Sequence, residues 1–263
     1  MKPIILFRKG YHGDDEYEVA KRYFDVVTSR MECKDNLVVG RYSCLPFYRE
    51  LERDLAYNNS VLVNTHNQHS WIADFGYYYD LSDFTPKSYD SDNFWNAPEG
   101  QYVVKGRTNS RKHQWKTHMF AENKKRAVEI GHELLQDGLL CEQGIIYREY
   151  VPLNVLEIDQ YNSLPYANEW RFFYYKRTRL SYGFYWSSAE AETMNNAYMN
   201  DEGIEFAETV ANAAADMADF FVLDIAEKKD GGWVLIEMND AQQSGLSENN
   251  PDILYYNLRE ALA

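Results

Sequence analysis

The sequence predicts a mixed α/β (α+β) protein with a small α/β lobe at its amino terminus. Strand-like apolar segments alternate with helix-periodic segments over residues 3–65, which favours a parallel sheet. Polar residues and prolines fill residues 85–100, where we place a lobe boundary. Aromatic and apolar strand pairs dominate residues 168–240. We therefore expect an amino-terminal lobe over residues 1–84 and a second unit over residues 85–263.

The amino-terminal lobe should contain three short strands and two helices. Apolar residues at period 3.6 indicate the helices, and short apolar runs indicate the strands. The expected strands are residues 3–7, 36–42 and 60–65, and the expected helices are residues 14–27 and 46–57. Residues 66–100 are predicted to be mainly loop. His66 and His69 lie there without an apparent third metal ligand, and we interpret them as polar loop residues.

The second unit should contain several antiparallel strand pairs. The clearest is a hairpin at residues 220–240, because two apolar strands flank the turn sequence KKDGG. Two aromatic strands are expected within residues 168–186. The other expected elements are strands at residues 101–107, 116–120 and 144–151 and helices at residues 122–136 and 204–219.

Composition excludes several function classes. The chain of 263 residues has a net charge of −14, which disfavours general binding to nucleic acids or anionic membranes. No apolar run approaches the roughly 20 residues of a membrane span, and the start of the chain lacks the order of a secretory signal. Cys33, Cys44 and Cys141 are far apart and read as reduced thiols. We expect a soluble, cytoplasmic protein.

Three polar residues interrupt the predicted hairpin at residues 220–240. Glu237 and Asn239 point to the same face of one strand, and a turn at Asp230-Gly231 places Asp224 opposite Glu237. Facing carboxylates repel unless a cation lies between them, and an all-oxygen set suits Mg²⁺. The alternative is that Glu237 and Asn239 lie on a solvated face of the hairpin.

Four segments, taken in order, resemble the ATP-grasp superfamily. VLDIAEKKDGGWVLIEMND is similar to its final hairpin, which ends in Glu-x-Asn, and YVVKGR is similar to its lysine-bearing strand. IIYREYVP resembles the connection between its two ATP-clamping lobes, and NEWRFFYY resembles its arginine-bearing strand. The resemblance implies an ATP-grasp fold in which lobes over about residues 85–150 and 151–263 clamp ATP and Mg²⁺.

The resemblance also implies roles for individual residues. Lys105 would contact ATP phosphates, and Arg171 would stabilise the transferred phosphate or hold a substrate carboxylate. The adenine pocket would consist of Glu149, Tyr150 and Val151. The metal ligands would be Asp224, Glu237 and Asn239. The corresponding plain interpretations are an edge-strand lysine for Lys105 and aromatic stacking for Arg171.

One departure from the family pattern concerns the segment RTNSRKHQWKT after Lys105. It contains no glycine, whereas family members often place a flexible Gly/Ser loop over the phosphates. Arg107, Arg111 and Lys112 could supply positive charge there instead, or form a solvated basic face. In this respect the chain resembles an ATP-grasp clade that is frequent in phages and in peptide-ligating operons.

The function implied is ATP-dependent ligation. The resemblance implies that a substrate carboxylate is activated as an acylphosphate and captured by an amine or thiol on an amino acid or peptide, with ADP and phosphate as products. The alternatives are a catalytically silent nucleotide-binding module and an RNA-ligase-like nucleotidyltransferase.

Overall fold

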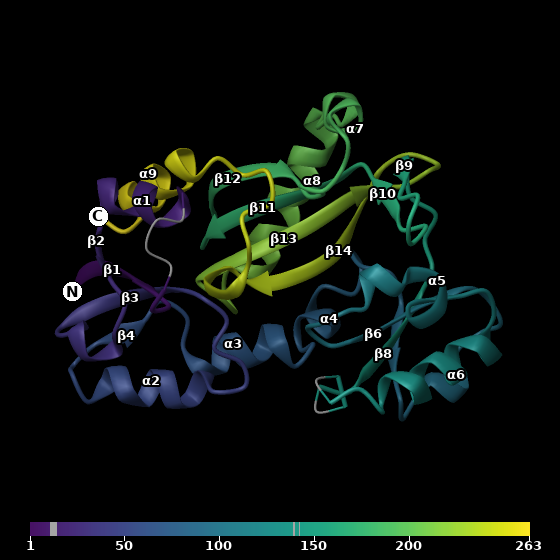
Figure 1. The fold of residues 1–263 in the computed structure, drawn as a ribbon, viewed down its shortest axis with the longest axis horizontal. Helices are drawn as coiled ribbons and strands as arrows, with labels where there is room; N and C mark the ends of the chain where they lie inside the picture. The colour runs from purple at the N-terminus through teal and green to yellow at the C-terminus, as the bar shows by residue number, and fades with distance from the viewer. Residues whose placement is uncertain (11–14, 139, 142) are drawn as a thin grey trace.

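Three four-stranded sheets and one two-stranded sheet form the frame of the molecule (Figure 1). They are found within residues 1–10, 15–138, 140–141 and 143–263, which the computed structural model describes. One four-stranded sheet is parallel and the other two are antiparallel. This is the mixed α/β architecture that the sequence predicts.

The amino-terminal lobe contains the parallel sheet, with strand order β2-β1-β3-β4. Its elements are β1 (Lys2–Phe7), α1 (Asp15–Tyr23), β2 (Asp25–Val27), the 3-10 helix η1 (Arg30–Glu32), β3 (Asn36–Arg41), α2 (Tyr48–Ala56) and β4 (Val61–Leu62). The helix predicted over residues 14–27 is therefore too long. Its last residues, Asp25–Val27, instead pair with Ile4–Leu6 as an edge strand, a conformation that suits the β-branched Val26 and Val27.

Residues 66–100 are not mainly loop, which corrects the sequence prediction. They form α3 (His66–Ala73), α4 (Tyr77–Asp80), β5 (Ser88–Asp90) and η2 (Phe94–Asn96). Helix α3 begins with a capping box, in which the Thr65 side chain accepts from the Gln68 backbone N–H while the Gln68 side chain accepts from the Thr65 N–H. The sequence Thr-x-x-Gln is a start signal for a helix.

The second sheet has the order β5-β8-β6-β7, and α6 (Lys124–Leu134) packs on it. Its further elements are β6 (Tyr102–Gly106), η3 (Lys112–Gln114), α5 (Trp115–His118), β7 (Phe120–Ala121) and β8 (Ile145–Glu149). The strand predicted over residues 116–120 is wrong, because α5 occupies most of it and only Phe120–Ala121 pair with β6. The helical turn lets Trp115 stack on Phe120, with 5.6 Å between ring centroids.

The third sheet is the largest, with the order β12-β11-β13-β14. Its strands and the elements around it are β9 (Val155–Ile158), β10 (Pro165–Ala167), β11 (Glu169–Tyr175), β12 (Thr178–Phe184), α7 (Ala191–Asn196), α8 (Asp201–Ala214), β13 (Phe220–Glu227), β14 (Trp233–Asp240), η4 (Ala241–Gln243) and α9 (Pro251–Ala261). The predicted helix at residues 204–219 begins and ends earlier, since Asn200 caps it by accepting from the Gly203 N–H.

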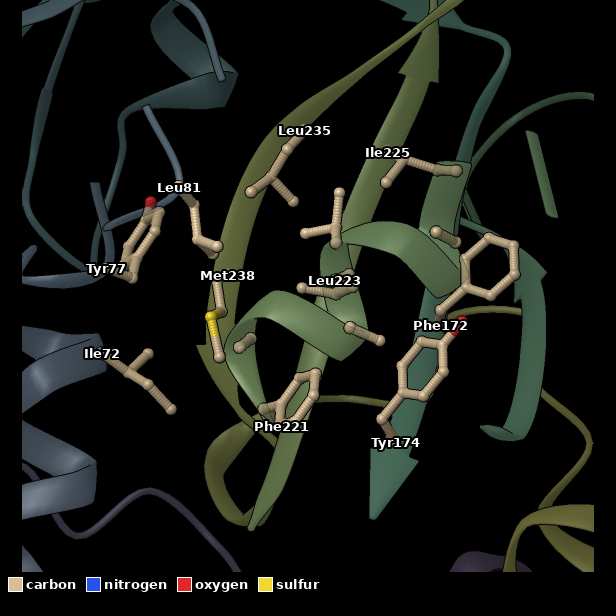
Figure 2. Packing of buried hydrophobic residues seen from close by; sticks show 14 of the residues in the cluster. Ile72, Tyr77, Leu81, Phe172, Tyr174, Phe221, Leu223, Ile225, Leu235 and Met238 are labelled. Carbon is tan, nitrogen blue, oxygen red and sulfur yellow. The ribbon is translucent and has the colours of Figure 1, made fainter. Parts of the chain in front are cut away.

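Both faces of the third sheet are covered. Small residues of α8 approach one face closely, and Figure 2 shows Ile72, Tyr77 and Leu81 beside Leu235 and Met238 of β14 on that same face. The opposite face packs in part against β1, β3, α1 and α9 through a shared apolar cluster. The amino-terminal lobe is thereby fixed against the sheet that bears the predicted metal ligands.

Candidate active site

The hairpin β13–β14 brings Asp224 opposite Glu237 as expected, although the pairs nearest the turn, such as Ile225 with Leu235, are shifted by one residue and a bulge between Asp224 and Ile225 restores the expected register. Asp224 pairs directly with Glu237, and Asn239 lies close enough for its amide nitrogen to donate to Asp224 Oδ2 over 3.4 Å. The solvated-face alternative, which concerned Glu237 and Asn239, is wrong for Glu237, because its side chain is only 14% exposed and that of Asp224 opposite it is 1% exposed. Asn239 is half-buried. Their role as metal ligands stays a prediction.

Lys105 of β6 reaches across from the second sheet to the third. It is buried, and its ammonium forms an ion pair with Glu237 Oε1. Burial opposes ionisation of Glu237, but the neighbouring charge of Lys105 prevails and lowers the pKa of this carboxyl to about 2. Lys105 is therefore not an exposed edge-strand lysine, and Glu237 is an anion at neutral pH.

Arg171 of β11 forms a second buried ion pair beside the first. Its Nε and Nη2 donate to the two oxygens of Asp224, each over 2.8 Å, and its Nη1 donates to the Gly245 carbonyl over 2.8 Å. The guanidinium also lies 4.8 Å from the ring centroid of Tyr185. Stacking on an aromatic ring is thus present, but it accompanies a bidentate pair with a predicted metal ligand.

A cavity of about 830 Å³, which includes its open mouth, lies between the second and third sheets. Its walls are mainly apolar and its inner end is charged, as is usual for a small-molecule site. The lining includes six predicted site residues, namely Lys105, Lys112, Glu149, Tyr150, Val151 and Glu237, and the apolar side chains of Val103, Met119, Leu153, Val155, Leu164 and Ile236. The predicted site residues outside this lining are Arg107, Arg171, Asp224 and Asn239.

Glu149 and Tyr150 lie where β8 leaves the second sheet. The Glu149 carboxylate accepts from the Tyr89 hydroxyl over 2.9 Å, and its backbone N–H donates to the Lys87 carbonyl over 2.8 Å. The Tyr150 N–H donates to Gln101 over 2.9 Å. These bonds hold the connection rigidly against one end of the cavity.

Arg148 is a cavity residue that the sequence analysis did not select. It is 5% exposed, its Nε donates to Ser88 Oγ over 3.2 Å, and its Nη1 donates to the Ile236 carbonyl. Its Nη2 is buried without a hydrogen-bond partner among the described residues. In the sequence, Arg148 interrupts the apolar run IIYREYV just as Lys105 interrupts YVVKGR. That pattern could have indicated a site residue.

Glu169 was also missed. It lies two residues before Arg171 on β11, so both side chains share a face, and it lines the cavity near Lys112. Burial raises the pKa of Glu169 to about 7, although the charge of Lys112 opposes this shift. The spacing Glu-x-Arg on a buried strand could have indicated it.

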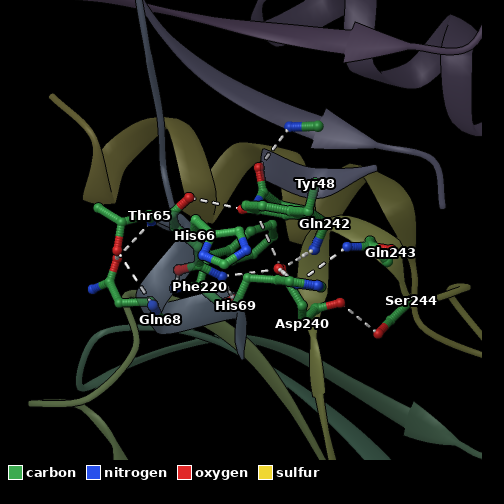
Figure 3. A network of polar contacts seen from close by, with 12 residues as sticks. Tyr48, Thr65, His66, Gln68, His69, Phe220, Asp240, Gln242, Gln243 and Ser244 are labelled. Atoms are coloured by element: carbon green, nitrogen blue, oxygen red, sulfur yellow. Dashed lines mark hydrogen bonds and ion pairs between the residues drawn. The ribbon is translucent and has the colours of Figure 1, made fainter. Parts of the chain in front are cut away.

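His69 is not a polar loop residue, which corrects the sequence interpretation. It is buried on α3, its ring stacks on Tyr48 with 3.9 Å between centroids, and its Nδ1 lies 2.9 Å from Asp240 Oδ2 (Figure 3). Asp240 also accepts from Asn64 Nδ2 over 3.0 Å. This network holds the end of β14, one residue beyond Asn239.

The residues around Asp224 fit a hard divalent cation in their chemistry. Among the described residues, no three His, Cys, Asp or Glu side chains converge as a metal site. A cation here would therefore be held by the two carboxylates, the amide oxygen of Asn239 and oxygens of its ligand, which is the pattern that Mg²⁺ favours.

Comparison with known proteins supports an assignment to a family. Residues 93–258, well over half of the chain, match the ATP-grasp domain of R2K clade family 3. No curated protein sequence matches the chain. No helix among the described residues is both long and apolar enough to cross a bilayer.

Several solved structures share the fold at low sequence identity. The chain is similar to D-cycloserine synthetase DcsG, with TM-score 0.64 and 11% identity over 99% of this chain and 100% of that chain. It is similar to a RimK domain ATP-grasp protein from Sphaerobacter thermophilus, with TM-score 0.59 and 13% identity over 97% and 98%. The ATP-grasp ligase PsnB, complexed with precursor peptide PsnA2 and AMPPNP, aligns with TM-score 0.57 and 10% identity over 99% and 96%. The chain belongs to the ATP-grasp superfamily, in family 3 of the R2K clade.

Proposed function

We propose that this protein is an ATP-dependent ligase that activates a carboxylate as an acylphosphate and joins it to an amine or thiol. One observation supports this most strongly. Lys105 of the second sheet meets Glu237 of the third at the charged end of a mainly apolar cavity, and the ion pair of Arg171 with Asp224 lies directly beside Glu237 on the third sheet. Such an arrangement suits a ligand with an apolar ring system at one end and a polyphosphate at the other.

In this proposal, residues at different places in the site bind different parts of ATP and of the substrate. Tyr150 and Val151 would enclose the adenine ring, while Lys105 and Lys112 would bind phosphate oxygens. The Glu149 N–H already donates to Lys87, so main-chain contacts from Glu149 to the base would come from its carbonyl group. Arg171 would orient the substrate carboxylate or the transferred phosphate, because a carboxylate attacking a phosphate must approach another anion.

Magnesium would be held by Asp224, Glu237 and Asn239, and when bound it would neutralise negative charge on the phosphates. The side chains that contact the two carboxylates carry positive charge, which suits a site for anionic phosphates. Lys105 keeps Glu237 ionised, and both Lys105 and Arg171 can transfer their hydrogen bonds to phosphate or carboxylate oxygens of substrates.

The acceptor in this proposal is an amino acid or a peptide. The structure of PsnB contains a precursor peptide, and a ligase from Chryseobacterium gregarium was solved with ADP and a leader and core peptide. These proteins share the fold with this chain at about 10% identity, so they support the class of acceptor and not its sequence.

The test is a screen of amino acids and short peptides for acceptor-dependent phosphate release, followed by mass spectrometry of the products. We expect ADP, phosphate and a product lighter by one water than its two precursors. ATP binding without any product would support a silent nucleotide-binding module. A covalent Lys105–AMP adduct would support a nucleotidyltransferase.

A matched variant links the activity to the hairpin. Glu237→Gln preserves the shape of the side chain but removes a charge that the metal requires. We expect Mg²⁺-dependent ATP turnover to fall at least 100-fold, with circular dichroism unchanged at working temperature. Unchanged turnover would show that the metal ligands are elsewhere.

A further inference from the structure

The segment after β6, residues 107–114, is here called the basic loop. It contains no glycine, and it lies at the charged end of the cavity, where both Ser110 and Lys112 are lining residues. A flexible loop would close over phosphates by bending. A loop without glycine bends less easily, so it needs contacts with other parts of the protein to hold it over the phosphates.

Lys112 attaches the basic loop to the third sheet. Its Nζ donates to the Tyr185 hydroxyl and lies 4.2 Å from the centroid of the Tyr185 ring and 5.0 Å from that of Trp186. Tyr185 and Trp186 directly follow β12, so this contact, like the pair of Lys105 with Glu237, links the two sides of the cavity. Ammonium groups bind aromatic faces well when water is excluded.

Tyr185 is itself firmly placed. Its backbone N–H donates to the Glu169 carbonyl over 2.9 Å, and its ring packs edge-on against Trp186 with 4.9 Å between centroids. The guanidinium of Arg171 lies 4.8 Å from the same ring that Lys112 contacts. One tyrosine ring therefore orders two cations that come from different sheets.

The electrostatics of Lys112 agree with a stable contact. Burial by itself would lower the pKa of this ammonium, but the Tyr185 oxygen and the carboxylates of Glu169 and Glu237 overcome that effect and raise it. An ammonium group has three donors, and the Tyr185 hydroxyl accepts one of them. The others remain suited to phosphate oxygens.

We propose that Lys112, Tyr185 and Trp186 form a clasp that closes the basic loop over the phosphate end of the cavity. In this clasp Tyr185 is a positioning residue, which aims Lys112 at the phosphates. The inference rests on the proposed ATP site and adds to it the contact that retains the nucleotide.

The test measures dissociation of a fluorescent ATP analogue, in the presence of Mg²⁺, by stopped flow. Tyr185→Leu removes ring and hydroxyl, and we expect it to raise the dissociation rate roughly tenfold. Tyr185→Phe keeps the ring and should produce a smaller increase. Tyr161→Leu is the matched control, because Tyr161 is 88% exposed and is not among the lining residues of the cavity, and its rate should equal that of the parent.

A double-mutant cycle separates the clasp from a merely structural role. Lys112→Met should raise the dissociation rate about as much as Tyr185→Leu, and the double variant should add little further, because both single changes break the same contact. Additive effects would overturn the clasp, as would unaltered dissociation in both single variants. If Tyr185→Leu fails to fold, Tyr185→Phe and Lys112→Met form the same cycle.

The parent protein distinguishes failure of the clasp from failure of the proposed function. If the parent binds no ATP analogue with Mg²⁺, both proposals are wrong. If the parent binds the analogue and the cycle is additive, only the clasp is wrong. The quenching of tryptophan fluorescence provides a second readout, since loss of the Lys112 contact alters the surroundings of Trp186 without any turnover.

Discussion

Two buried ion pairs lie next to each other at the charged end of the cavity, one in its lining and one behind it on the third sheet. Lys105 is paired with Glu237, and Arg171 is paired with Asp224. Buried pairs of this kind contribute little net stability, but removal of one partner leaves an uncompensated charge. Each residue therefore has two separable effects, one on folding and one on ligand binding.

Lys105→Met should lower both stability and nucleotide affinity. It leaves the Glu237 carboxylate buried without its cation, which should lower the free energy of unfolding by about 3 kcal/mol. Adding Glu237→Gln should restore much of this loss without restoring ATP binding. Urea denaturation and calorimetric titration with ATP measure the two effects, and equal ATP affinity in Lys105→Met would refute the phosphate role.

Glu169 makes stability depend on pH. Its pKa is about 7 in the folded protein and about 4.5 when unfolded, so the unfolded state ionises first as pH rises. Its contribution is complete below about pH 4.5 and is lost as pH rises through 7. Without nucleotide or metal, Glu169→Gln should be more stable than the parent by roughly 2–3 kcal/mol at pH 8, and this difference should vanish near pH 4. Denaturation midpoints across this pH range provide the measurement, and a constant difference would contradict it.

Single residues were predictable where a charge interrupts an apolar strand. Asp224 and Glu237 were selected by that signal and Lys105 by the resemblance of its strand to that of the family, whereas Arg148 had the same signal but was not selected. The sequence does not reveal that β6 and β14 belong to facing sheets, so the pairing of Lys105 with Glu237 could not be derived from it. His69 was misread because its partner Asp240 is 171 positions away.

At the scale of elements, close backbone approach fixes how β12 lies against the segment before α9. A Cβ atom built on Gly183 would lie 2.4 Å from the carbonyl carbon of Glu248 and 2.5 Å from the Asn249 nitrogen. Those atoms are backbone and cannot turn aside as a side chain does. Asn249 in turn donates to the Arg171 carbonyl over 3.1 Å, so the contact supports the site.

Gly183→Ala should therefore destabilise the protein by about 1–3 kcal/mol, because the strand and the segment must separate. Gly100→Ala is the matched control, since a Cβ atom there meets nothing within 4 Å. Chemical denaturation of the two variants provides the comparison. A Gly183→Ala protein as stable as its control would mean that this approach is looser in solution.

Elements differed in how well the sequence predicted them. The hairpin at residues 220–240 was predicted well, because its turn residues and its apolar strands agree. The short strands β2, β7, β9 and β10 were missed or misplaced, since strands of two to four residues depend on their partner strands more than on their own composition. Helix α3 was missed although its capping box was visible at Thr65 and Gln68.

At the scale of the whole molecule, the amino-terminal lobe and the third sheet share one core. Ile5 and Phe7 of β1 pack in the same apolar cluster as Phe173 and Val222 of the third sheet. The boundary predicted near residue 85 separates regions of sequence, but this cluster joins residues on both sides of it. Removal of the lobe would expose these aromatic and aliphatic side chains to water.

We expect thermal unfolding in one cooperative transition, because the shared cluster couples the lobe to the sheet. Calorimetry should give equal calorimetric and van't Hoff enthalpies, and a chain beginning at residue 85 should lack a sharp transition. The full chain provides the control. Two resolved transitions, or a stable truncated chain, would show that the lobe folds independently.

The end of β14 and the residues directly after it hold the amino-terminal lobe against the third sheet. Asp240 contacts His69 and Asn64, and Gln242 accepts from the Gly40 N–H over 3.0 Å, directly after the Glu237–Asn239 segment. A chimaera that grafts a foreign amino-terminal lobe onto this chain must bring its own counterpart of residues 240–243. The amino-terminal lobe and the residues that hold it in place thus lie far apart in the sequence.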